Sequence, residues 1–391
     1  MVRMGTAAAG AFGIAAALTL FATGSAVADD GKLNGDGGYV YKGAPRTFLW
    51  NPQPNQLIDT SKYKKNPPYV IGFSNASISN VWRVGFANAL YSAASANRNK
   101  IKRLIVTDAN DSPAKQVADI QDLIQQGVDI LIVSAATAEA LDPIVTRAMK
   151  QGIPVVMVDR SVTSENFVSF ITSNNVAAGR IYAQWIVEKL NYKGNVIMLP
   201  GIPGAGSSQE RVEGAMEVFS QYPGVKILDT QHTDFSQAKG KTVAAAMIQK
   251  FGKSIDAIWS IAGGTGTGAL EAFIDAGYKD GEIPVTVCGD INSCLLLSIK
   301  HKIPAINIDY PSAMGGIAIK VALDVLSGTP VLHTYQANAD IMVTKGDETA
   351  SVKADQWVED YAQPDKPYDY ILDTGLGKNY DPSTFKPDYP S

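Results

Sequence analysis

The chain has 391 residues, 18% of them charged, and a formal net charge of −4. Charge this balanced, without a basic stripe, excludes the electrostatic footprint of a nucleic-acid-binding protein. The chain has two cysteines and three histidines. They lack the spacing of metal ligands, so we expect no metal and no cofactor.

The N-terminus predicts export. Arg3 supplies a short basic region, residues 5–22 form an uncharged apolar run, and Ala26-Val27-Ala28 is a small-x-small cleavage site. Together these parts are typical of a signal peptide, which we place at residues 1–28. No cysteine near the cleavage site can carry a lipid. We therefore expect a periplasmic protein without a lipid anchor.

The next segment, residues 29–68, is rich in Gly, Pro, Asn and Lys and has no periodicity, which predicts an extended arm. From residue 69 onward, short apolar runs alternate with amphipathic stretches of helical spacing. The first set of predicted strands is 69–73, 104–107, 130–133 and 155–158, with predicted helices at 82–97, 114–126 and 138–150.

The same alternation resumes after residue 174. Predicted strands are 195–199, 225–228, 257–261, 285–288 and 306–308, and predicted helices are 175–190, 208–220, 236–251, 266–276, 293–300 and 312–326. The strands are apolar on both faces, as in parallel sheets covered by helices on each side. The fold class is therefore α/β, with two similar doubly wound parallel-sheet lobes. Residues 355–391 are irregular and predict a surface tail.

Polar side chains directly after the predicted strands are the candidate ligand-binding residues, because open parallel sheets bind ligands beyond the carboxyl ends of their strands. Carboxylates and arginine bracket sugar hydroxyl groups with charge-assisted hydrogen bonds, and aromatic faces cover the C–H patches of a sugar ring. The candidates are Ser74, Asn75, Asn80, Trp82, Asp159, Arg160, Gln209, Phe235, Asp290 and Asp309.

Other features give weaker signals. The glycine-rich segments that start at Gly201 and Gly263 lack the spacing of nucleotide-binding loops. None of the histidines lies beside a serine or cysteine nucleophile in a recognisable elbow, so we expect no enzyme activity. Cys288 and Cys294 are either joined by a disulfide, which an oxidising compartment permits, or are two buried thiols.

Residues 69–345 resemble the ribose-type periplasmic binding proteins of the type I fold, which are relatives of the lac-repressor ligand-binding core. The resemblance is carried by 117–126 with Asp-Ile-Leu-Ile-Val at 129–133, by Gly-Ile-Pro-Val-Val-Met-Val-Asp-Arg at 152–160, by Ser-Asn-Asn-Val-Ala-Ala-Gly-Arg at 173–180 and by Asp-Phe-Ser-Gln-Ala-Lys-Gly at 234–240. It implies a three-stranded hinge near 173–174, 309–311 and 333–336. The lobes would then be 69–173 plus 310–332 and 174–309 plus 333–354.

The resemblance also implies roles for individual residues. Asp159 and Arg160 would hold hydroxyl groups from the N-terminal lobe, Trp82 and Phe235 would cover the two ring faces, and Asp290 would bind from the C-terminal lobe. Three positions depart from the pattern of the ribose binders: Gln209 stands where they have Arg, Ala262 where they have Asn, and Asp309 where they have a hinge Gln. Ribose itself is therefore not expected.

We predict a monomeric solute-binding protein that closes two lobes around a sugar or polyol and delivers it to the membrane permease of an ABC transporter. Two alternatives stay open. One is a ligand-binding component for chemotaxis or signalling, with a chemoreceptor as partner. The other is a binder of a cationic small molecule, because three candidate acids stand against one arginine among the candidates.

Overall fold

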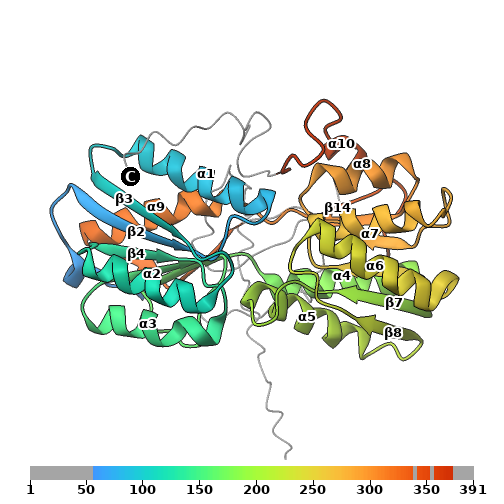
Figure 1. The fold of residues 1–391 in the computed structure, drawn as a ribbon, viewed down its shortest axis with the longest axis horizontal. Helices are drawn as coiled ribbons and strands as arrows, with labels where there is room; N and C mark the ends of the chain where they lie inside the picture. Colours follow the sequence, from blue (N-terminus) through green and yellow to red (C-terminus); the bar gives the residue numbers. More distant parts are fainter. Residues whose placement is uncertain (1–55, 338–340, 353–355, 373–391) are drawn as a thin grey trace, which may run out of the picture.

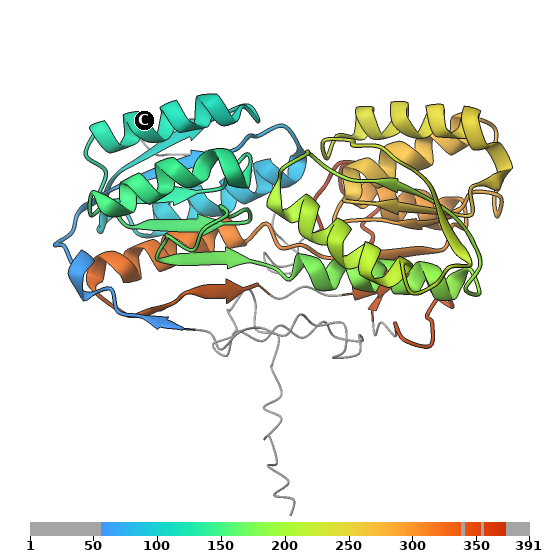
Figure 2. The same ribbon diagram turned by 90° about the horizontal axis from the view of Figure 1, so that it is seen from below.

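The computed structural model describes residues 56–337, 341–352 and 356–372. The predicted signal peptide, most of the predicted arm and residues 373–391 lie outside the described residues. Figure 1 shows two α/β lobes side by side, and Figure 2 shows the same lobes from below. No helix within the described ranges is long and apolar enough to span a membrane.

The N-terminal lobe is built on a parallel sheet with the strand order β13-β6-β5-β4-β2-β3. Its strands are β2 (Tyr69–Asn75), β3 (Ile101–Asp108), β4 (Ile130–Val133), β5 (Val155–Val158), β6 (Ser169–Thr172) and β13 (Thr334–Gln336). Helices α1 (Val81–Ala96) and α9 (Met314–Ser327) pack together on one face, and α2 (Pro113–Gln125) and α3 (Ala138–Lys150) pack together on the other. Because both faces are covered, β4 and β5 are buried along their whole length.

The C-terminal lobe repeats this plan with the strand order β15-β14-β11-β10-β9-β7-β8. Its strands are β7 (Gly194–Leu199), β8 (Val225–Thr230), β9 (Ala257–Ser260), β10 (Val285–Val287), β11 (Ala305–Ile308), β14 (Ile341–Val343) and β15 (Gln356–Trp357). Strand β14 runs antiparallel to β11, and the other pairs are parallel. The helices are α4 (Asn175–Lys189), α5 (Gly206–Phe219), α6 (Gln237–Phe251), α7 (Gly263–Asp275), α8 (Asn292–Lys300) and α10 (Val358–Tyr361).

The prediction of two parallel-sheet α/β lobes is confirmed, but the lobe boundaries differ from those expected. The resemblance implies that residues 333–354 belong to the C-terminal lobe, whereas β13 pairs with β6 of the N-terminal lobe. The chain therefore passes between the lobes after β6, after β11 and between β13 and β14. The third passage lies after Gln336 because the backbone of residues 334–336 completes the edge of the first sheet.

Both predicted extensions also contribute to the lobes. In the arm, β1 (Leu57–Ile58) pairs with β12 (Val331–Leu332), and Tyr63 is buried in the N-terminal core. In the tail, β15 extends the second sheet, and Val358, Tyr370 and Leu372 are buried in the C-terminal core. The described part of the tail, residues 356–372, buries single side chains rather than a periodic face.

Cys288 and Cys294 form a disulfide, with an S–S distance of 1.98 Å and a Cα–Cα distance of 5.7 Å. The bond joins the residue after β10 to the first turn of α8, and both cysteines are fully buried. Of the two alternatives that the sequence left open, the structure has the disulfide. The closed loop, Gly289 to Ser293, is short.

Reduction of this disulfide should lower stability modestly. A loop of this size contributes about 2 kcal/mol in the chain-entropy treatment, which corresponds to a drop of several degrees in Tm. Thermal unfolding of the protein with and without a reductant strong enough to reach a buried bond measures the difference. A Cys288→Ala/Cys294→Ala variant is the control, because its Tm should not respond to the reductant. An unchanged Tm after verified reduction of the native protein would contradict the prediction.

Candidate functional site

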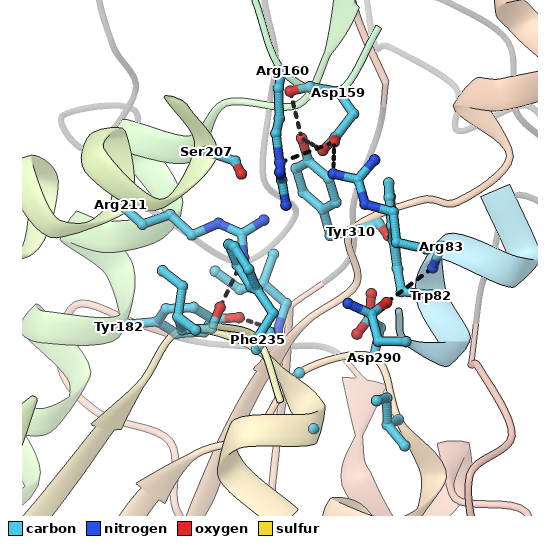
Figure 3. A pocket seen from close by; sticks show the side chains of 17 residues that line it. Trp82, Arg83, Asp159, Arg160, Tyr182, Ser207, Arg211, Phe235, Asp290 and Tyr310 are labelled. Atoms are coloured by element: carbon cyan, nitrogen blue, oxygen red, sulfur yellow. Dashed lines mark hydrogen bonds and ion pairs between the residues drawn. The ribbon is translucent and has the colours of Figure 1, made fainter. Parts of the chain in front are cut away.

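A pocket lies between the lobes, where the carboxyl ends of the two sets of strands face each other. Figure 3 shows side chains from both lobes converging on it. The lining residues are Asn80, Trp82, Arg83, Asp159, Arg160, Tyr182, Ser207, Arg211, Phe235, Ile261, Ala262, Gly264, Gly289, Asp290, Ile291, Ile308 and Tyr310. The loops after the strands supply most of them, as expected for open parallel sheets.

Asp159 is the centre of the N-terminal half of the pocket. It follows β5 in a tight turn in which the N–H of Arg160 donates to the carbonyl of Val158 at 2.7 Å, and its φ is +62°. This left-handed conformation is costly for a residue with a side chain, and such strain is concentrated at functional sites. The turn directs the carboxylate inward, where only 3% of the residue is exposed.

The carboxylate of Asp159 is surrounded by partners. Oδ2 pairs with Nη2 of Arg83 at 2.7 Å and accepts from the hydroxyl of Ser134 at 3.2 Å, and Oδ1 accepts from the hydroxyl of Tyr310 at 3.2 Å. Nη1 of Arg83 donates to Ser134 at 2.9 Å. A buried carboxylate is stable only with such partners. Asp159 therefore holds the first lobe of the pocket together as well as facing it.

Arg160 is buried with its hydrogen-bonding capacity incompletely used. Nε lies 3.6 Å from Asp159 Oδ2 and Nη1 lies 4.0 Å from Asp111 Oδ1, both too long for hydrogen bonds. Among the described residues, neither nitrogen has a hydrogen-bond partner. Burial, together with the nearby Arg83, lowers the pKa of Arg160 to about 10. These N–H groups need an acceptor, because an unpaired buried donor is costly.

The second lobe contributes a further guanidinium at Arg211, in α5. Nε donates to Asn175 Oδ1 at 2.9 Å, and Nη1 donates to the carbonyl of Ile261 at 2.8 Å. The group lies 4.4 Å from the ring centroid of Tyr310, within the range of a cation–π contact. Helices α4 and α5 pack closely here, since a methyl group added at Gly179 would lie 2.0 Å from the carbonyl oxygen of Arg211. This close approach fixes the start of the Arg211 side chain.

Aromatic rings form the walls of the pocket. Trp82 stacks on Phe86 with ring centroids 5.4 Å apart, and its indole N–H donates to the carbonyl of Tyr310 at 2.8 Å. Phe235 stands on the other lobe, and its ring lies 5.2 Å from the guanidinium of Arg160. That contact joins the two lobes, as does the hydrogen bond from the N–H of Ala138 to the carbonyl of Gly204 at 3.2 Å. The lobes are closed on each other.

The structure brings together six of the predicted site residues: Asn80, Trp82, Asp159, Arg160, Phe235 and Asp290. Asn80 also caps α1, because its Oδ1 accepts from the N–H of Arg83 at 3.0 Å. Asp290 lies inside the disulfide loop and is 5% exposed.

Four predicted residues do not line the pocket. Ser74 accepts a hydrogen bond from Gln116 at 3.2 Å, and Asn75 donates to the carbonyl of Ser77 at 2.8 Å, so both stabilise the N-terminal lobe. Asp309 is buried at the end of β11. Gln209 is exposed, because it lies on the outer face of α5 while Ser207, Ser208 and Arg211 face inward.

The expectation of a single guanidinium was wrong. Of the described residues that line the pocket, three are arginines and two are aspartates. Arg83 and Arg211 lie inside helices, not directly after strands, so a search of strand ends passes over them. Helical periodicity was the available signal for Arg211, because it is one turn beyond Ser207. Tyr182 and Tyr310, also missed, lie on a helix and on an interlobe crossing.

The chemistry of the pocket is that of binding. Guanidinium and carboxylate groups lie beside hydroxyl groups and aromatic rings, an arrangement suited to a small ligand rich in hydroxyl groups. In the part of the chain that the structure describes, no group of three or more His, Cys, Asp or Glu residues could hold a metal ion.

Comparison with known proteins gives consistent matches. The family model of the periplasmic binding protein domain matches residues 71–330. The ribose import binding protein of Bacillus subtilis is 32% identical over 73% of this chain and 90% of its own length. A solved arabinose-transporter binding component from Shewanella, bound to L-arabinofuranose, is 25% identical with a TM-score of 0.65, over 70% of this chain and 91% of its own.

A solved Mycobacterium smegmatis protein in complex with β-D-fucofuranose is 27% identical, with a TM-score of 0.65 over 70% of this chain and 90% of its own. The family match covers more than half of the chain and includes β2 to α9 of both lobes. With its two α/β lobes closed over a polar and aromatic pocket, the chain belongs to the periplasmic binding protein family.

Proposed function

We propose that this protein captures a neutral sugar in its furanose form, or a related polyol, and presents it to the membrane permease of an ABC importer. The observation that carries the proposal is Arg160, whose buried Nε and Nη1 lack hydrogen-bond partners among the described residues while its side chain lines the pocket. A hydroxyl oxygen of the ligand would accept from the Arg160 guanidinium where it faces the pocket. Trp82 and Phe235 would cover the apolar faces of the ring.

The charges that line the pocket and the ligands of the similar proteins both indicate the class of ligand. Three lining arginines against two aspartates, of which Asp159 is already paired with Arg83, disfavour a cationic ligand. The similar proteins are named for ribose, or were solved with arabinofuranose and fucofuranose. We therefore place a furanose first and a polyol second, and we expect the ligand to leave unchanged, without turnover.

Closure of the lobes would be the working step. A ligand that bonds to both lobes stabilises the closed form by its differential affinity for that form. Export through the segment at 1–28, periplasmic location and a monomeric state remain part of this proposal. A signalling partner in place of a permease is the alternative, and affinity capture of membrane proteins by the ligand-loaded protein separates the two.

A thermal-unfolding panel should identify the ligand class. The panel contains L-arabinose, D-galactose, D-ribose, D-fructose, xylitol, myo-inositol and putrescine. A ligand at about 100 times its Kd adds roughly 2.7 kcal/mol, a rise of several degrees in Tm. We expect the rise with a sugar that populates furanose forms, and recovery of that sugar intact. A rise with putrescine alone, or with no compound after refolding from denaturant, would contradict the proposal.

Arg160→Lys should weaken sugar binding by about tenfold to hundredfold, because lysine cannot reproduce the paired N–H donors of a guanidinium. Arg160 is a better test than Asp159, whose loss would leave Arg83 buried without its partner. The control is Arg147→Lys, on the exposed face of α3. Isothermal titration measures both variants, and equal affinity of Arg160→Lys and native protein would remove Arg160 from the site.

A further inference from the structure

The chain after α10 returns to the edge of the pocket. Its residues 363–372 lie over the C-terminal lobe and run toward the gap between the lobes (Figure 1). The segment lies beyond the family match, which ends at residue 330. We call it the strap.

Asn292 attaches the strap to the C-terminal lobe. Its side-chain amide donates to the carbonyls of Gln363 at 2.7 Å and Pro367 at 3.3 Å, and its Oδ1 accepts from the N–H of Gln363 at 2.9 Å. The backbone N–H of Asn292 donates to the carbonyl of Tyr370 at 2.9 Å. Asn292 is fully buried. Asn292 thus holds the start of the strap with its side chain and the Tyr370 carbonyl with its backbone.

The end of the strap pairs with the pocket wall itself. Ile371 forms an antiparallel bridge with Ile291, and the N–H of Leu372 donates to the carbonyl of Asp290 at 2.8 Å. Asp290 and Ile291 both line the pocket. Their loop is therefore held by the disulfide on one side and by the strap on the other.

Ile371 reaches the opposite lobe. In an extended segment neighbouring side chains alternate, so Tyr370 and Leu372 enter the C-terminal core while Ile371 points away from it. A methyl group added at Gly85, in α1 of the N-terminal lobe, would lie 2.9 Å from Cδ1 of Ile371. Ile371 is only 4% exposed. The strap is thus attached to one lobe and contacts the other.

We propose that the strap is an interlobe clasp of the binding site: it positions Asp290 and Ile291 against the ligand, and Ile371 contacts α1 when the lobes close. The role in affinity rests on the proposed function. Opening the lobes separates Ile371 from Gly85 and exposes its side chain, so this apolar contact favours the closed form alone. Ile371 and Asn292 are positioning residues for the ligand site.

A cross-linking experiment tests the contact without any ligand. The full chain with Gly85→Cys and Ile371→Cys is oxidised, and the linked peptides are identified by mass spectrometry. A disulfide that accumulates between the two positions is expected, because each closure brings them together. The matched control pairs Gly85→Cys with Ile299→Cys, an exposed position of α8. If the Ile371→Cys pair forms no more disulfide with Gly85→Cys than the Ile299→Cys pair does, the clasp is overturned.

An affinity measurement tests the effect of the Ile371 contact on ligand binding. Ile371→Ala should weaken binding of the sugar that gives the largest shift in the panel by about fivefold to thirtyfold, with faster dissociation. The control, Ile299→Ala, should bind like the native protein. Native affinity in Ile371→Ala would overturn the role in closure. If the disulfide between positions 85 and 371 forms but no panel sugar binds, the proposed function is contradicted, while the interlobe contact is still supported.

The Gly85→Ala variant distinguishes an effect on lobe closure, measured by affinity, from an effect on stability, measured by Tm. Alanine favours a helix over glycine, so the Tm of the ligand-free protein should not fall. Affinity should fall, because the new methyl group meets Ile371 only in the closed form. Adding Ile371→Val, which removes Cδ1, should restore much of the affinity. A loss of Tm with no rescue would assign the clash to Ser312 within the N-terminal lobe, whose Oγ would be 3.1 Å away, and would overturn the interlobe explanation.

Discussion

The buried carboxylate of Asp159 is the constraint on which the pocket depends. A charge with 3% exposure is tolerable only because Arg83, Ser134 and Tyr310 all contact it. These partners come from α1, from the end of β4 and from the interlobe crossing before α9. One carboxylate therefore links three segments that are far apart in the sequence, while Nε and Nη1 of the neighbouring Arg160 have no hydrogen-bond partner among the described residues.

The two lobes supply different things to the pocket. The N-terminal lobe brings the paired charges around Asp159, and the C-terminal lobe brings Arg211, Phe235 and the Asp290 loop. Neither half encloses a ligand alone, and ring contacts such as that between Phe235 and Arg160 exist only between them. The closed arrangement of the lobes therefore brings the two parts of the polar lining together.

Much of the fold could be predicted because the signals are local. Central strands such as β4 and β5 are continuous apolar runs, and α2 and α3 have a clear helical periodicity, so their bounds agree with the sequence within one residue. Strands β6 and β13 were missed. They are four and three residues long. Strand β6 pairs with the nearby β5, whereas β13 is defined by its pairing with β6, more than 160 residues earlier in the chain. Sequence pattern carries little information about such distant pairing.

The site was predictable only in part, for a related reason. Asp159, Arg160, Phe235 and Asp290 follow strands, so the topology of parallel sheets finds them. Arg83 and Arg211 sit within helices, where only the register of the helix against its sheet decides which side chains face inward. Gln209 shows the consequence, since two positions along α5 turn a side chain from the pocket to the solvent.

The interleaved path of the chain has a consequence for biosynthesis. The N-terminal sheet lacks its edge strand β13 until residue 336 has been made, and its core lacks α9 until residue 327. The C-terminal core lacks Tyr370 and Leu372 until nearly the end of the described chain. The N-terminal lobe therefore cannot complete its sheet until the segments of the C-terminal lobe that lie between β6 and β13 have been made. Contacts between such distant parts of a chain form slowly, so this path predicts slower folding than two lobes that each come from one continuous segment.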